Sequence, residues 1–138
     1  MAHLQRAVAT LRISGDNLLP DEVSGFLGAG PTVSHAKGQE IDLPSGRYSI
    51  TKSGIWWLSA ADTEPEDLDS QVDEILGQLT LDLTVWHDLG KRFYIDLFCG
   101  WFLGGSNEGV DISHQTLLAL GERGIRLGVD IYGPAAGA

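Results

Sequence analysis

Two aspartates inside apolar segments are the residues that most directly suggest chemistry. Asp96 lies in FYIDLFCGWF and Asp130 in IRLGVDIYG, each followed two residues later by an aromatic side chain. If the two segments are neighbouring strands, their carboxylates could share a proton and act as acid and base, in a cleft lined by Trp101 and Tyr132. The alternative is a sheet face partly open to water, with Arg126 as a countercharge across strands. We favour this alternative.

Other residue types that support catalysis do not occur in catalytic patterns. The lone Cys99 lies in an apolar strand, where a buried thiol is inert. The glycine clusters GAG and LGGSNEG match no phosphate-binding pattern, and no GxSxG elbow occurs. The histidines form no two-histidine metal motif; they are His3, His35, His87 and His114. We therefore expect no catalytic residues, no metal site and no cofactor.

An acidic segment follows two adjacent tryptophans in SGIWWLSAADTEPEDLDSQVDE. Neighbouring strand residues point to opposite faces, so only one tryptophan can face a one-sided core. Trp57 shares a face with Ile55, and we expect it in the core. Trp56 should then lie at the surface, where tryptophan is a common interface anchor.

No lysine or arginine occurs between Lys52 and Lys91. Acidic residues at a helix start are stabilised by the helix dipole, but Asp73 lies beyond the reach of that effect. The remaining negative surface suits a basic protein partner. The residues that we expect to bind it, besides Trp56, are Glu64, Glu66, Asp67, Asp69 and Asp73.

The composition limits the class of protein. With 138 residues and 43% apolar side chains, the chain is expected to form one domain, 1–138, with a core from about 8 to 133 and short flexible termini. A net charge of −10 argues against nucleic-acid binding. The chain has no long apolar run, no signal-like start and a single cysteine, so we expect a cytoplasmic protein without a membrane span.

Hydrophobic periodicity predicts the elements. Alternation indicates strands in AVATLRIS, RFYIDLFCGWFLGG and IRLGVDIYG, with Ala7, Ala9, Leu11 and Ile13 on the buried side of the first. A short helix should begin at Pro20 and end at Gly28, and another should follow Ser113 and end at Gly124. A single long helix is expected over 65–89, although LTLDLTVW also alternates as a strand does. The region 48–58 is typical of one or two strands with a turn at 52–54.

This order predicts an α+β fold: a two-layer sandwich of a mainly antiparallel sheet with helices packed on one face. The segments YIDLF and GVDIY repeat one pattern, as a weak internal duplication would produce.

Most of the chain, about Val8 to Gly133, resembles a bacterial family known as domain of unknown function 4279. The segments that support this resemblance are LRISGDNLLPDEVSGFLGAGPTVSHAKGQEI, CGWF and DIY. The resemblance implies an α+β fold and a bacterial origin, and it assigns no catalytic residue.

Two functional hypotheses follow. We favour a non-enzymatic protein-binding module, such as an immunity protein that neutralises a basic toxin. This role is drawn by analogy with other small acidic α+β domains. The alternative is a small-molecule binder or an enzyme that uses the cleft of Asp96 and Asp130. The sequence leaves the oligomeric state open.

Overall fold

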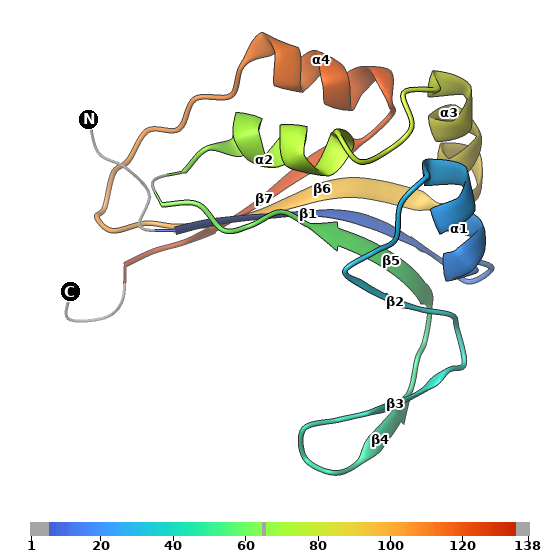
Figure 1. Cartoon of the computed structure of the whole chain (residues 1–138). Helices are drawn as coiled ribbons and strands as arrows, with labels where there is room; N and C mark the ends of the chain where they lie inside the picture. Colours follow the sequence, from blue (N-terminus) through green and yellow to red (C-terminus); the bar gives the residue numbers. More distant parts are fainter. Residues whose placement is uncertain (1–5, 65, 135–138) are drawn as a thin grey trace.

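The computed structural model describes residues 6–64 and 66–134 as one sheet with a helical layer and a projecting ribbon (Figure 1). The five-stranded sheet has the order β2-β5-β1-β6-β7, antiparallel except for the β6/β7 pair. The helices lie on one face of this sheet, which confirms the predicted α+β class. The elements are β1 (Arg6–Gly15), α1 (Pro20–Leu27), β2 (Val33–His35), β3 (Glu40–Asp42), β4 (Tyr48–Ile50), β5 (Gly54–Ser59), α2 (Leu68–Leu76), α3 (Leu83–Arg92), β6 (Tyr94–Phe102), α4 (His114–Glu122) and β7 (Arg126–Tyr132).

The core lies between the sheet and the helices. The predicted alternation of β1 is confirmed, because Ala7, Ala9, Leu11 and Ile13 are all buried. The row of β6 that starts at Ile95 is buried beside them, and Cys99 is completely enclosed. Period-two burial of this kind requires a sheet covered on one side only.

The short helices begin and end where local chemistry predicts. Pro20 opens α1, and Gly28 ends it in the left-handed region at φ 88°, which glycine adopts without strain. The Ser113 hydroxyl accepts a hydrogen bond from the Thr116 N–H and caps α4. Gly124 follows α4 at φ 70°.

The single helix expected over 65–89 is wrong, because two helices meet there at an angle (Figure 1). The chain leaves α2 after Leu76, and the Thr80 N–H donates to the Leu27 carbonyl at 2.8 Å. The Asp82 carboxylate caps α3, and the Trp86 indole donates to the Thr80 carbonyl. These contacts to another element and to the linker replace the hydrogen bonds that a continuous helix would make.

The expected orientation of the two tryptophans is also wrong. Trp56 lies opposite Ile13 of β1 on the covered face, and it is fully buried. Its indole N–H donates to the Ser24 hydroxyl at 3.0 Å, which satisfies the polar atom of a buried ring. Trp57 lies opposite Arg12 on the uncovered face.

The segment 48–58 forms two strands that do not pair with each other. β4 pairs with β3 in a separate ribbon, defined here as residues 40–50, while β5 belongs to the main sheet. Thr51 fixes the root of the ribbon: its hydroxyl donates to the Ala36 carbonyl at 2.6 Å and accepts from the Gln39 N–H. The strand order of the main sheet does not show a repeated unit. β6 and β7, which carry the two similar segments, are neighbours, whereas β5 separates β1 from β2. The weak internal duplication stays a prediction.

Candidate functional site

The face of the sheet opposite the helices carries no covering element among residues 6–64 and 66–134 (Figure 1). Because paired residues share a face, the register aligns Trp57, Arg12, Asp96 and Arg126 in one row across four strands. We call this surface the open face. Its side chains on β1, β5, β6 and β7 are Arg6, Val8, Thr10, Arg12, Ser14, Ile55, Trp57, Ser59, Tyr94, Asp96, Phe98, Phe102, Arg126, Asp130 and Tyr132.

The Arg12–Asp96 ion pair lies at the centre of the open face. Nε and Nη2 of Arg12 donate to the two oxygens of Asp96 at 2.9 and 2.7 Å. The hydrogen bond to Asp96 raises the pKa of Arg12, and burial partly offsets this rise. The guanidinium also lies 4.5 Å above the Phe98 ring and 5.8 Å from the Trp57 ring. The carboxylate is therefore neutralised and the cation is held between aromatic rings.

Two further arginines lie over aromatic rings on the same face. Arg6 lies 5.0 Å above Phe102 and binds Asp62 at 2.9 Å. Arg126 lies 5.3 Å above Tyr94, and it forms no ion pair within the described ranges. All three arginines of the open face thus combine a cationic group with an aromatic ring.

The outer end of the open face is aromatic. Phe102 and Tyr132 stack with ring centroids 4.6 Å apart. The Tyr132 hydroxyl donates to the Asp130 carboxylate at 3.0 Å, and this hydrogen bond raises the pKa of the exposed phenol.

A hollow of about 240 Å³ opens between the central pair and the rings. Its lining residues are Arg12, Ser14, Ile55, Trp57, Tyr94 and Asp96. Pockets for drug-sized molecules usually start at about 300 Å³, so this hollow is smaller than a typical pocket of that kind.

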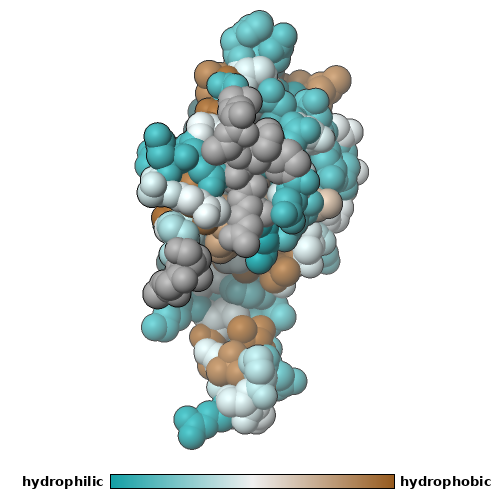
Figure 2. Space-filling view, turned by 90° about the vertical axis from the view of Figure 1, so that its left-hand side faces the viewer, coloured by the Kyte–Doolittle hydropathy of each residue, from teal (hydrophilic) through white to brown (hydrophobic). Residues whose placement is uncertain are grey.

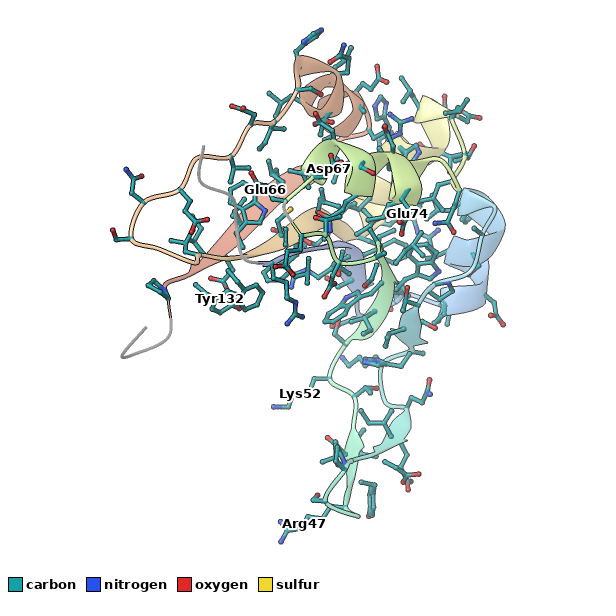
Figure 3. All side chains as sticks on the ribbon, turned by 60° about the vertical axis from the view of Figure 1, so that its left-hand side comes forward. Arg47, Lys52, Glu66, Asp67, Glu74 and Tyr132 are labelled. Atoms are coloured by element: carbon teal, nitrogen blue, oxygen red, sulfur yellow. The ribbon has the colours of Figure 1, made fainter. Side chains whose placement is uncertain are left out.

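The ribbon projects from the body beside the open face. Figure 2 shows it standing clear of the body with hydrophobic side chains at its surface, and Figure 3 places Arg47 at its tip and Lys52 near its root. Tyr48 and Ile50 are exposed. A two-stranded ribbon is marginally stable on its own in water.

Of the acidic residues predicted to bind a partner, Asp69 and Asp73 lie in α2, and Figure 3 places Glu66 and Asp67 on the other side of the sheet from Tyr132. Asp67 caps α2 by accepting from the Ser70 N–H. Asp69 accepts hydrogen bonds from the Thr116 hydroxyl and the Ser113 N–H, and the Thr116 bond contributes most to lowering its pKa. Glu64 and Asp73 are exposed and Glu66 is half-buried. Trp56, the aromatic residue of the predicted partner-binding set, is buried and is therefore not exposed beside these acidic residues.

The predicted cleft of two aspartates does not form. Asp130 lies opposite Gly100, four positions along β6 from Asp96, which is about 13 Å at strand spacing. Trp101 points to the helix side, while Tyr132 and both aspartates belong to the open face. The countercharge of Asp96 is Arg12, from the neighbouring strand on the other side, and not Arg126 as expected.

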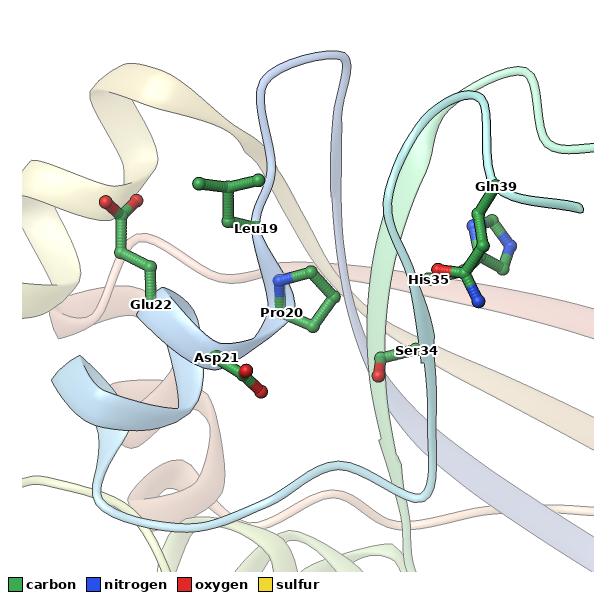
Figure 4. Close-up of a pocket in the computed structure, with 7 residues that line it drawn as sticks. All are labelled: Leu19, Pro20, Asp21, Glu22, Ser34, His35 and Gln39. Carbon is green, nitrogen blue, oxygen red and sulfur yellow. The ribbon is translucent and has the colours of Figure 1, made fainter.

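A second hollow of about 530 Å³ lies between the start of α1 and the edge strand β2 (Figure 4). The carboxylate of Glu22 accepts a hydrogen bond from Arg92 at 2.6 Å and is already engaged. His35 Nδ1 is enclosed without a hydrogen bond in the described part of the chain. The other lining residues are Leu19, Pro20, Asp21, Ser34 and Gln39.

The side chains of the described ranges form neither a metal-binding site nor a reactive-thiol site. No group of three His, Cys, Asp or Glu side chains there could hold a metal ion. The Cys99 thiol is buried, and desolvation raises its pKa to about 12. No helix in these ranges has the length and apolar character to cross a membrane.

Sequence reasoning missed Arg12, Phe98 and Trp57 as members of one surface. The available signal was the alternation itself, because Arg12 and Phe98 occupy the strand positions opposite the buried rows. The arginines and aromatic residues at the solvent-facing positions of β1 and β6 could therefore be identified from the sequence, but the alignment of the strands could not.

Comparison with known proteins identifies the family. A search of the curated proteins and a search of the solved structures each gave no match. The profile of one family, described as Domain of unknown function (DUF4279), matches residues 5–134. This match covers nearly the whole chain. The chain therefore belongs to the DUF4279 family.

Proposed function

We propose that the chain is a non-enzymatic protein-binding module whose binding surface is the open face together with the ribbon. The observation that supports this most directly is the set of three arginines that lie over aromatic rings on a sheet face that no described element covers. Arginine, tryptophan and tyrosine are the residue types most enriched among interface anchors. Rings and guanidinium groups already held by their neighbours also lose little conformational freedom on binding.

The state of the titratable groups favours binding over catalysis. Each oxygen of Asp96 accepts a hydrogen bond from Arg12, so this carboxylate already serves an ion pair within the fold. The raised pKa of Cys99 keeps the thiol protonated at neutral pH, and a protonated thiol is a poor nucleophile.

The unpaired cations of this surface indicate the class of partner. Arg6 and Arg12 are already paired with Asp62 and Asp96, and the ribbon also carries Glu40 and Asp42. Arg47, Lys52 and Arg126 form no ion pair within the described ranges. A partner protein with acidic side chains would pair with these three cations. The toxin-neutralising role predicted from the sequence stays a prediction; a basic toxin would bind the acidic helical layer instead, where Asp67 and Asp69 already serve internal hydrogen bonds.

Photo-crosslinking in the source cells tests the location of the surface. A photoreactive phenylalanine is placed at Trp57 on the open face, at Tyr48 on the ribbon and, as control, at Leu81, which is exposed in the α2–α3 linker. We expect a shared protein adduct from the first two positions and none from the third. An adduct from Leu81 alone would place the binding surface on the helical side and contradict the proposal.

Affinity measurements with the identified partner provide the second test. Trp57→Ala should weaken binding by about 2 kcal/mol, or roughly thirtyfold, if the ring is a central anchor. The matched control Asp73→Asn changes an exposed acid of the helical layer and should leave affinity unchanged. Thermal unfolding of both variants verifies that the fold is intact.

A further inference from the structure

The outer strand β7 leaves a long hydrogen-bonding edge without a partner in the described ranges. β7 ends the sheet order, and the Leu103 N–H donates to the Tyr132 carbonyl. In a parallel ladder, both backbone groups of every second residue point to the same neighbour. Tyr132 and Asp130 therefore direct their backbone groups to β6, while Leu127, Val129 and Ile131 direct theirs outward.

This edge lacks most of the usual protections against pairing. Sheet edges are normally shortened, bulged, or occupied by charged side chains or proline. β7 has seven residues, contains no proline, and pairs with β6 in an unbroken register, and its two charged residues, Arg126 and Asp130, are of opposite sign. The opposite edge of the sheet, β2, has only three residues. Val129 and Ile131 are 39% and 59% exposed although they point to the helix side.

The neighbouring helix adds apolar surface above the same edge. α4 contacts β7. The buried residues of α4 are Thr116 and Leu120, and Ala119 packs against the core on one side of them. At about 100° per residue, Leu117 lies on the other flank, where it is exposed. A partner at the β7 edge would therefore meet apolar side chains from both the strand and the helix.

The charges of β7 are complementary to those of a second β7. Arg126 and Asp130 point to the open face two residues on either side of Gly128. Neither side chain has an ion pair within the ranges that the structure describes. In an antiparallel pair centred on Gly128, each Arg126 lies opposite Asp130 of the other copy. The same register pairs Leu127 with Val129, and glycine at the axis has no side chain to clash. Ile131 lies opposite Ile125, which precedes β7, is buried and donates its N–H to the Leu120 carbonyl, so the paired segment ends before this position.

We propose that β7 pairs antiparallel with β7 of a second copy of this chain, forming a two-fold symmetric dimer. Such an interface is isologous, so every contact occurs twice. The two five-stranded sheets become continuous, and their open faces lie side by side on the same face of the joined sheet. This proposal concerns the edge of the sheet and does not depend on the proposed function of the open face.

Sedimentation velocity of the full chain tests the proposal, with far-UV circular dichroism as the check of folding. We expect wild type to sediment as a dimer of the 14.8 kDa chain. Ile131→Lys places one charge from each copy in the exposed apolar row of the joined edge and should give a monomer at the same concentration. The matched control Leu81→Lys changes an exposed leucine far from β7 and should remain a dimer. A monomeric wild type, or an Ile131→Lys variant as dimeric as wild type, would overturn the proposal.

Charge reversal tests the register and remains informative if Ile131→Lys fails to fold. Asp130→Arg sets two like charges opposite each other and should raise the dissociation constant about tenfold or more. Adding Arg126→Glu restores opposite charges at both contacts and should recover most of the affinity. A folded double variant that dimerises no better than Asp130→Arg contradicts the proposed pairing.

Discussion

Removal of the Arg12 guanidinium should destabilise the fold far more than removal of an exposed arginine. Arg12→Met keeps an unbranched apolar stem over the Phe98 ring but leaves the carboxylate of Asp96 without its two hydrogen bonds. The side chain of Asp96 is only 6% exposed, whereas that of Arg12 is 33% exposed. The lost interaction is therefore one partner of a largely buried pair.

The expected cost follows from these exposures. Breaking a buried pair by removing one partner costs about 3–5 kcal/mol, because the remaining charge stays desolvated. We expect about 3 kcal/mol, the lower end, since water reaches the exposed third of the Arg12 site. Arg6→Met is the matched control: the Arg6–Asp62 pair has the same 2.9 Å separation, but both side chains are more than half exposed. Its loss should cost less than about 1 kcal/mol.

Urea denaturation followed by tryptophan fluorescence measures both costs, because Trp56 and Trp86 are buried and report on unfolding. The double variant Arg12→Met, Asp96→Leu should recover much of the stability, since replacing a whole buried pair by apolar residues is often neutral. A cost for Arg12→Met no larger than that for Arg6→Met would refute the argument that Asp96 depends on Arg12.

Two further predictions use the shifted pKa values. The Cys99 thiol, with its pKa raised to about 12 by burial and then by the charge of Asp96, should react with iodoacetamide at neutral pH only at the rate at which the protein opens; rapid reaction of the native protein would contradict this. Thr116→Val removes the hydroxyl that contributes most to lowering the pKa of Asp69. A lowered carboxyl pKa stabilises the fold above the unfolded value, and this stability is lost as pH falls through the folded value. The variant should therefore lose about 1–2 kcal/mol of unfolding free energy at neutral pH and less in acid, and a loss independent of pH in urea titrations would exclude this role.

Elements that depend on nearby residues could be predicted from the sequence. The buried row of β1 follows from alternation, because a strand with one covered face must alternate. The limits of α1 follow from Pro20 and Gly28, and the start of α4 from Ser113, because helix ends are determined by backbone groups within one turn. The division between α2 and α3 could not be predicted with the same certainty. Apolar spacings of three and four continue through it, and the Thr80–Leu27 hydrogen bond that fixes the linker joins segments far apart in the chain.

The candidate surface depends on tertiary structure in the same way. Alternation determines that Trp56 and Trp57 face opposite sides, but both rows of GIWWLS are apolar and neither identifies the covered side. The pairing of Trp56 with Ile13 decides it. The partner of Asp96 was likewise undetermined, since β1 and β7 both bring an arginine to the strand that carries it.

The sequence by itself determined the α+β class, the family, most of the strands and helices, and the buried row of β1, because periodicity and capping act over a few residues. Only the tertiary structure decided which tryptophan is buried, which arginine neutralises Asp96, and that β3 and β4 leave the sheet as a separate ribbon. The first two depend on the register between strands, which joins residues as far apart in the chain as Arg12 and Asp96, 84 positions, and the third depends on which strands pair. A shift of one residue in that register would exchange the open face for the core.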